Sequence, residues 1–168
     1  RYYAQWDRME EKERQLHRNQ IADLYILTAQ KYEHSAIFLH PNPGDIEELL
    51  KLIDTVREKS GDEYFLMMHG DATYSIPDGE SMVDFSYRLA DDPDSVKANA
   101  DAIVNAALET AAIYKDHGGL DGFALCSDYC LNTGPFLSPG QFSEFVTPYL
   151  TKLIAGQRDM GFYTIKHT

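Results

Sequence analysis

Cysteine is scarce in this chain: among its 168 residues, only Cys126 and Cys130 are cysteines. Two thiols cannot form the framework of a small disulfide-stabilised secreted domain, so a cytoplasmic location is expected. The chain also lacks any apolar run near the ~20 residues that a membrane-spanning helix needs, and it has no signal-peptide pattern. Glycine-rich nucleotide-binding motifs, H-E-x-x-H and C-x-x-C are absent as well, so no short motif identifies a function.

Basic residues are few, with 15 Lys and Arg against 27 Asp and Glu and a formal net charge of −12. A chain of this charge is unsuited to electrostatic binding of nucleic acid or of an anionic membrane. The charge also disfavours a polyanionic substrate, unless arginines are gathered locally. The hydrophobic share of 43% and the charged share of 25% are typical of a globular protein, and the length suggests one domain.

The two ends of the sequence resemble internal positions of a longer chain. The first residue is Arg1 rather than Met, and Thr168 follows a strand-like run with no helix after it. We therefore expect residues 1–168 to be part of one domain of a longer protein, with both ends missing.

Four short apolar runs alternate with helical patterns along the chain. The runs are typical of strands buried on both faces, and they cover residues 36–39, 64–68, 123–126 and 162–167. Apolar spacing predicts helices over residues 9–33, from Asn42-Pro43 to Gly61, and over 80–89, 92–117 and 138–160. The last helix has the clearest start, because Ser138 can cap it, Pro139 suits its first turn and Gln141 completes a capping box. Pro148 predicts a kink within it.

Strands that alternate with helices imply an α/β protein with a parallel sheet. Such a sheet is either open, as in flavodoxin-like folds, or about half of a (β/α)8 TIM barrel, because a complete barrel typically needs ~250 residues. The missing ends favour the half barrel.

Each apolar run ends in a polar residue that can take part in chemistry. His40, His69 and His167 follow or close three of the runs, and Ser127 with Asp128 follows the fourth. Parallel α/β proteins place their sites at the carboxyl ends of the strands. Because three of the six histidines stand there, the pattern indicates a functional rim. The alternative is that polarity simply returns where each strand leaves the core, and for His40 this alternative is preferred.

Residues 121–167 also carry a series of motifs. The series consists of Asp121-Gly-Phe and Ser127-Asp128, then Gly134-Pro-Phe-Leu-Ser-Pro139, Phe145-Val-Thr-Pro-Tyr149 and a strand ending in His167. Upstream stand His69-Gly70-Asp71 and the helix start Ala90-Asp-Asp-Pro93. The combined pattern resembles the uroporphyrinogen decarboxylase superfamily, well over residues 60–168 and weakly before them.

The resemblance implies a (β/α)8 barrel and one of two chemistries. Decarboxylases of the family remove acetate carboxylates from uroporphyrinogen III, in porphyrin metabolism, without a cofactor. Related methyltransferases move methyl groups between a corrinoid (cobalamin) protein and a small acceptor, usually with zinc. The decarboxylase-like reaction, that of a carbon–carbon lyase, is the primary expectation, because it needs no residue beyond Thr168. The methyltransferase is the runner-up, and a non-catalytic flavodoxin-like binding module is the third alternative.

The sequence departs from both family patterns where they can be compared. The Arg-bearing N-terminal motif of the decarboxylases would lie before Arg1. The methyltransferase cysteine would lie two residues after His167, which is past the last residue. The segment 129–133 is longer than in a plain decarboxylase, which favours a divergent paralogue.

The expected catalytic residues are Asp128, His167 and His69. The resemblance implies that Asp128 accepts hydrogen bonds from pyrrole N–H groups or stabilises a protonated intermediate, and His167 is a candidate general acid. In the methyltransferase alternative, His167 is a zinc ligand, with Cys130 as a soft partner. Each assignment has a structural alternative, since Asp often closes turns and a lone histidine is often part of the core.

The expected substrate-binding residues are Asp71, Tyr74, Arg88 and Ser127. Asp71 follows a glycine that permits close approach of a ligand, Tyr74 lies in a long loop that can cover a substrate, and Arg88 can pair with a carboxylate. Packing of Tyr74 and solvation of Arg88 are the alternatives. The expected partner is a small molecule, a tetrapyrrole or a methyl donor, with no nucleic acid and no membrane, and a homodimer is compatible with the sequence.

Overall fold

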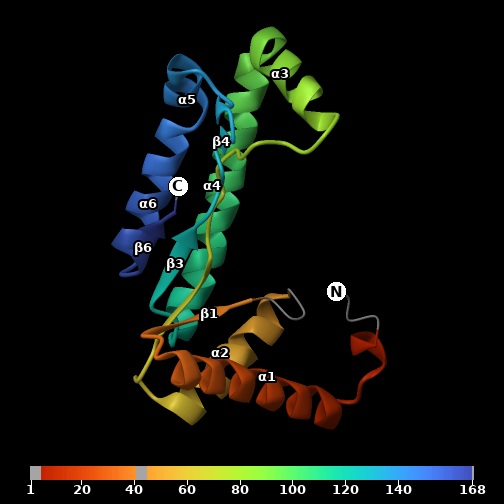
Figure 1. Ribbon diagram of the computed structural model, residues 1–168, viewed down its shortest axis with the longest axis vertical. Helices are drawn as coiled ribbons and strands as arrows, with labels where there is room; N and C mark the ends of the chain where they lie inside the picture. The colour runs from red at the N-terminus through yellow and green to blue at the C-terminus, as the bar shows by residue number, and fades with distance from the viewer. Residues whose placement is uncertain (1–4, 41–44, 168) are drawn as a thin grey trace. The chain divides into compact units, whose positions relative to one another are not determined.

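Helices alternate with strands in the computed structural model, which describes residues 5–40 and 45–167 (Figure 1). The elements are η1 Trp6–Arg8, α1 Glu11–Tyr32, β1 Ala36–Leu39, α2 Ile46–Ser60, β2 Phe65–His69, α3 Ser81–Asp91, α4 Pro93–His117, β3 Gly122–Leu125, β4 Cys130–Leu131, β5 Gly134–Pro135, α5 Pro139–Phe145, α6 Thr147–Asp159 and β6 Tyr163–Lys166.

Four of the strands form a parallel sheet in the order β1-β2-β3-β6, which confirms the predicted α/β class. β1 and β2 pair from Ala36 opposite Phe65 to Leu39 opposite Met68. Every residue of β3 is buried, as expected of a strand covered on both faces. The short strands β4 and β5 form a separate antiparallel hairpin with Cys130 opposite Pro135.

Helix starts follow the capping chemistry of the sequence. α5 begins with the predicted capping box, in which the Ser138 hydroxyl accepts from the Gln141 amide at 3.2 Å and the Gln141 side chain accepts from the Ser138 amide at 3.0 Å. α2 begins at Ile46, where the Asp45 carboxylate accepts from the Glu48 amide at 2.9 Å. Asn42 and Pro43, which were predicted to start that helix, lie outside the described residues.

The helix predicted over 138–160 is in fact two helices. α5 ends at Phe145, and Val146, with φ −121° and ψ −53°, separates it from α6. Pro148 has no N–H to donate to the carbonyl of Glu144, and its ring crowds that carbonyl. The helix is therefore interrupted for one residue next to the predicted kink, while the Val146 amide still donates to the Phe142 carbonyl at 3.0 Å and the Leu150 amide to the Val146 carbonyl at 2.9 Å.

The chain divides into two units, which are described separately. The first comprises Arg1–Met68 and Tyr114–Gly122, and the second comprises His69–Ile113 and Phe123–Thr168. None of the described helices has a stretch long and apolar enough to cross a bilayer.

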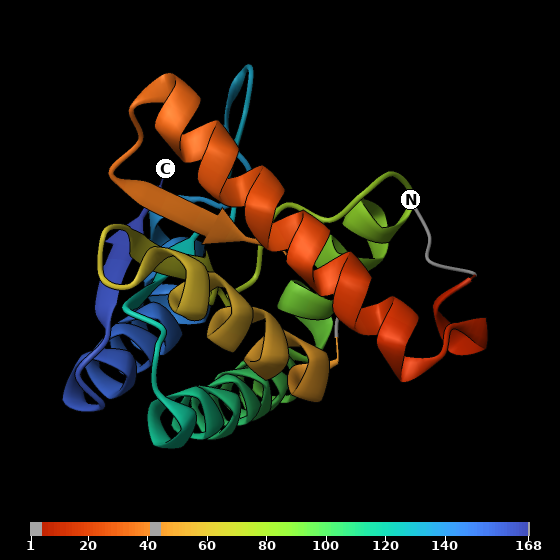
Figure 2. The same cartoon turned by 90° about the horizontal axis from the view of Figure 1, so that it is seen from below.

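In the first unit, α1 runs alongside α2 (Figure 2). α2 buries an apolar face that includes Leu49, Ile53 and Val56. α1 buries only Arg18 and two alanines, whereas its Leu16, Leu24 and Leu27 are each more than half exposed. These three leucines of α1 are therefore largely on the surface.

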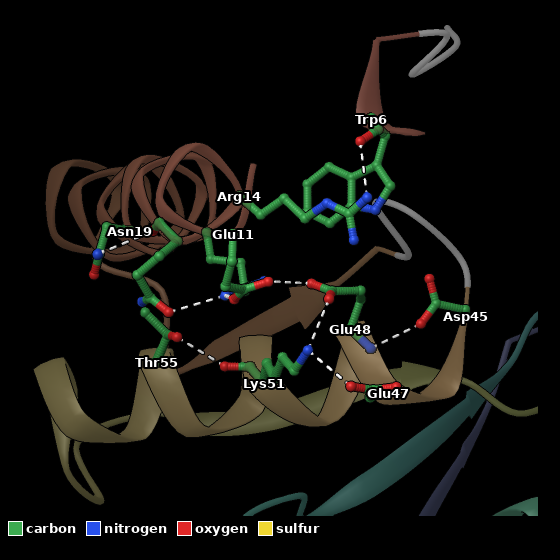
Figure 3. A network of polar contacts seen from close by, with 11 residues as sticks. Trp6, Glu11, Arg14, Asn19, Asp45, Glu47, Glu48, Lys51 and Thr55 are labelled. Carbon is green, nitrogen blue, oxygen red and sulfur yellow. Dashed lines mark hydrogen bonds and ion pairs between the residues drawn. The ribbon is translucent and has the colours of Figure 1, made fainter. Parts of the chain in front are cut away.

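A polar network joins α1 to α2 (Figure 3). Arg18, only 3% exposed, donates to the carboxylate of Glu48 at 2.5 Å and to that of Glu11. Burial alone would lower the pKa of the Arg18 guanidinium, but its bonds to both glutamates outweigh burial and raise the pKa. Lys51 donates to both Glu47 and Glu48, at 2.9 and 3.0 Å. This network holds two helices of the first unit together.

The second unit has an apolar core of its own. One cluster of buried apolar residues in this core contains Phe85, Leu89, Val96, Leu137, Phe145 and Val146, and Tyr74, Tyr129, Phe136 and Phe142 pack against it. The core lies under the loops that follow β2 and β3, and it therefore fixes the segments that build the site.

Candidate functional site

A hollow of about 490 Å³ lies in the second unit, at the ends of β2 and β3. We name it the acidic hollow; its lining residues are His69, Asp71, Ser75, Ile76, Asp78, Cys126, Ser127, Asp128 and Cys130. It lies where the strand-end pattern predicted a site, since the carboxyl ends of neighbouring parallel strands meet at one edge of a sheet.

Gly70 lets the two strand ends approach each other. Its amide donates to the carbonyl of Ala124 at 3.1 Å, and a Cβ built on Gly70 would lie 2.6 Å from the side chain of Phe123. Any residue with a side chain would push these segments apart. The close passage brings Asp71 beside Ser127.

The carboxylate of Asp71 is the most heavily bonded group of the hollow. The side chain is 9% exposed; Oδ1 accepts from the amide and the hydroxyl of Thr73, at 3.0 and 2.7 Å. Oδ2 accepts from the Ser127 amide at 2.9 Å and from Lys166 Nζ at 3.3 Å. Burial alone would raise the pKa of Asp71, but the bonds from Thr73 and Ser127 and the charge of Lys166 outweigh it, so the pKa lies below its ordinary value. Asp71 is therefore a buried anion at neutral pH.

Lys166, in β6, is held by three acceptors. Its ammonium donates to the carbonyls of Ser127 and Leu125, at 3.0 and 3.2 Å, as well as to Asp71. An ammonium has three N–H groups, so these acceptors use all of them. Lys166 Nζ also lies 4.5 Å from the centroid of the Tyr129 ring. This cation therefore binds the protein itself and has no N–H left for a ligand.

The direction of the hydrogen bond between Thr73 and Tyr129 follows from the number of protons that their hydroxyl groups carry. The Thr73 hydroxyl lies 2.7 Å from the Tyr129 hydroxyl, and either oxygen has the geometry to donate. Thr73 has one hydroxyl proton, which goes to Asp71, since an ionised carboxylate can only accept. Tyr129 therefore donates to Thr73 and keeps its own oxygen free to accept a further hydrogen bond.

The charge of the hollow is negative. Asp71, Asp78 and Asp128 line it, and no Lys or Arg is among its described lining residues. The side chains of Asp78 and Asp128 are exposed, so both present their carboxylates to solvent. Such a site favours ligands that donate hydrogen bonds or carry positive charge.

Four of the predicted site residues meet in this hollow. His69 and Asp128 are exposed at its lining, Asp71 is buried at its base, and Ser127 donates to Asp71 through its amide. The carbonyl of Asp128 accepts from the Ile76 amide at 3.0 Å, which ties the loop after β3 to the loop after β2.

The other three predicted residues are not part of this lining in the described structure. Tyr74 packs against Phe85 and donates to the Val96 carbonyl at 3.0 Å, in agreement with the packing alternative. Arg88 is exposed in the last turn of α3. His167 is exposed after β6, and its amide donates to the Leu125 carbonyl at 3.0 Å. The rim residue His40 belongs to the first unit.

The donor set of the described residues does not fit a zinc ion. Within residues 5–40 and 45–167, no three His, Cys, Asp or Glu side chains come together as metal ligands would. His167 and Cys130, expected as ligands in the methyltransferase alternative, are not part of such a group.

A second hollow, of about 520 Å³, adjoins the first. We name it the apolar hollow; its lining residues are Tyr129, Cys130, Pro135, Leu137, Pro139, Phe142, Ser143 and Thr147. Cys130 lines both hollows, so both border on this residue.

Sequence reasoning missed Lys166, Thr73 and Tyr129. No sequence signal identified Lys166: its half-burial in β6, where Tyr163 and Ile165 are exposed, is a property of the folded structure.

Comparison with known proteins does not extend this description. No protein-family model, no curated protein and no solved structure matches the chain.

Proposed function

We propose that the second unit carries the active site of an enzyme that acts on a small organic molecule at the acidic hollow. The observation that supports this most is the meeting of Asp71, Asp128 and His69 at the ends of two adjacent strands. A buried, fully bonded carboxylate beneath two exposed titratable groups is typical of a site rather than of a surface loop.

The reaction proposed first is a decarboxylation without cofactor, as the resemblance of residues 60–168 implies. When the carbon–carbon bond to a carboxylate breaks, CO₂ leaves and the bonding electron pair stays on the substrate. A protonated, positively charged ring next to that carbon takes up the pair. The carbon then gains a proton in place of CO₂, and the ring loses the proton that had activated it, so that one proton is consumed in all. The carboxylate of Asp128 stabilises the positive ring, and His69 is positioned to hold the exchanging proton.

For the fold, we propose about half of a (β/α)8 barrel. The outward residues of β6 support this, since Tyr163 is 70% and Ile165 46% exposed. Apolar side chains on the last strand of the sheet are expected where a further strand or helix covers them. A self-contained flavodoxin-like module would be expected to bury them.

Methyl transfer with a corrinoid protein is the second candidate. The observation that favours it is the negative charge of the acidic hollow, which suits a positively charged methyl donor better than a substrate with many carboxylates. No step is assigned to zinc, because the described residues do not fit it.

An assay for CO₂ release from uroporphyrinogen III, under anaerobic conditions, tests the first candidate. Asp128→Asn should lower the rate about 100-fold, because it removes the charge that stabilises the cation. Glu80→Gln, which changes an exposed acidic residue outside the lining, should leave the rate unchanged. No CO₂ from the unmodified protein would exclude the reaction, and full activity of Asp128→Asn would exclude its assigned role. Stoichiometric zinc in the full-length protein would favour methyl transfer instead.

A further inference from the structure

We infer that the acidic hollow and the apolar hollow form one binding site for a protonated amine with an apolar body. The ammonium end would lie against Asp78 and Asp128, and the apolar end would lie on Phe142 and Leu137. The inference rests on the proposed site but not on the proposed decarboxylation, whose substrate carries many carboxylates; it names a cationic class of molecule that this site would bind.

The charges of the acidic hollow select a cation. The ammonium of Lys166 contacts Asp71 of this hollow, so its charge is already opposed. The carboxylates of Asp78 and Asp128 then remain as a surplus of negative charge, with no Lys or Arg among the described lining residues. Opposite charges within a few ångströms attract most strongly where a concave wall limits solvent.

The hydrogen-bonding groups of the hollow select an N–H donor. Asp78 and Asp128, which line the acidic hollow, only accept when ionised. Tyr129 lines the apolar hollow, and its oxygen has acceptor capacity left because its proton goes to Thr73. Lys166 donates nothing to a ligand, because its three N–H groups are in use. A primary ammonium can satisfy several acceptors at once, whereas a quaternary ammonium offers no N–H. The face of the Tyr129 ring is also occupied by Lys166, so it does not provide a cage for a quaternary group.

The apolar hollow suits the rest of such a molecule. Pro135, Leu137, Pro139 and Phe142 line it, and Phe142 is itself held edge-on against Tyr129 at 5.0 Å between ring centroids. The hairpin that carries Cys130 is fixed by the bond from the Phe136 amide to the Tyr129 carbonyl at 3.0 Å. Each hollow is within the size range of small-molecule sites, about 300–1,000 Å³. A molecule with one ring and a short aminoalkyl chain is therefore the expected ligand.

Calorimetric titration of the full chain with three probes tests the inference. The probes are 2-phenylethylamine, 3-phenylpropionate and ethylamine, which separate the contribution of the charge from that of the ring. We expect 2-phenylethylamine to bind at least about tenfold more tightly than either of the others, and to bind less tightly as salt is added. Equal binding of the amine and the carboxylate would overturn the inference.

Variants test which residues bind the ammonium end of the ligand and which bind its apolar end. Asp78→Asn and Asp128→Asn should each weaken 2-phenylethylamine binding at least about threefold, while Glu80→Gln should leave it unchanged. Phe142→Leu, a milder change than removal of the side chain, should weaken 2-phenylethylamine but not ethylamine. Unchanged binding in the Asp78→Asn/Asp128→Asn double variant, with a native circular dichroism spectrum, would contradict the assignment.

The outcomes separate this inference from the proposed reaction. If the amine binds through Asp78 and Asp128 but no CO₂ is released from uroporphyrinogen III, the ligand class stands and the decarboxylation fails. If decarboxylation depends on Asp128 but the amine does not bind, the ligand class fails and the reaction stands.

Discussion

The carboxylate of Asp71 and the ammonium of Lys166 lie 3.3 Å apart, although 95 positions separate them in the chain. Both side chains are largely buried, at 9% and 18% exposure. Because Lys166 also donates to the carbonyls of Leu125 and Ser127, one ammonium ties together the ends of β2, β3 and β6. This ion pair therefore determines the shape of the site.

Removal of one partner of this pair should destabilise the protein. Asp71→Asn leaves the Lys166 ammonium without its counter-ion, and we expect a loss of about 3 kcal/mol in the free energy of unfolding. Urea denaturation, monitored by circular dichroism, measures this loss in the free energy of unfolding.

A double-mutant cycle controls for packing. Lys166→Met should also lower the free energy of unfolding. The loss in the Asp71→Asn/Lys166→Met variant should be smaller, by about 1–3 kcal/mol, than the sum of the losses in the two single variants. Simple additivity would show that the two groups do not interact energetically.

The stability of the protein should fall in acid because of Asp71. Its pKa in the folded protein lies below the ordinary value of about 4, so the unfolded chain takes up the proton first as the pH falls. The stabilisation is therefore complete above about pH 4 and is lost as the pH falls further, through the folded pKa. Unfolding free energies measured between pH 3 and pH 6 should show the gap between wild type and Asp71→Asn narrowing toward the acid end. A difference in unfolding free energy that does not change with pH would show that Asp71 is not the cause of the acid sensitivity.

The two glutamates that bind Arg18 should differ strongly in importance. Glu48 is 7% exposed and Glu11 is 64% exposed, yet both accept from the same guanidinium. Glu48→Gln removes a buried charge opposite Arg18 and should cost about 3 kcal/mol, whereas Glu11→Gln should cost much less, because solvent screens that pair. The same substitution at two positions provides the matched control, measured by chemical denaturation. Equal losses would argue against burial as the cause.

Alanine should have opposite effects at two glycines. At Gly70 a methyl group would lie 2.6 Å from Phe123, so Gly70→Ala should destabilise by about 1–3 kcal/mol and should disturb ligand binding in the acidic hollow. At Gly140, in the first turn of α5, only the Ser138 hydroxyl lies within 4 Å, so Gly140→Ala should stabilise by up to about 1 kcal/mol. Thermal unfolding of both variants distinguishes these effects.

The strands and most helices were predictable from the sequence, because local chemistry determines them. Four apolar runs became four parallel strands, and the capping box at Ser138 and Gln141 has the predicted bonds. The interruption of the helix at Val146 lies next to Pro148, where the sequence predicted a kink, but a sequence pattern does not show how far a kink separates the two halves of a helix.

The meeting of four candidate residues in one hollow was predictable from the sequence, but the hydrogen bonds among its residues were not. Its location followed from the strand ends, which brought His69, Asp71, Ser127 and Asp128 to one hollow. The ion pair of Asp71 with Lys166 and the chain from Tyr129 through Thr73 depend on how segments far apart in sequence pack, which local periodicity does not encode. For the same reason, the exposure of Leu24 and Leu27 on α1 could not be read from their apolar character.

The long separation of Asp71 from Lys166 also has a consequence for the order of folding. Contacts within α5 and α6 join neighbouring residues and can form early, whereas the ion pair closes a loop that includes most of the second unit. We expect groups that meet so late to contribute little to the transition state, so their loss should speed unfolding and leave the folding rate nearly unchanged. We therefore expect substitution of Asp71 or Lys166 to shorten the lifetime of the folded second unit more than it slows the formation of that unit.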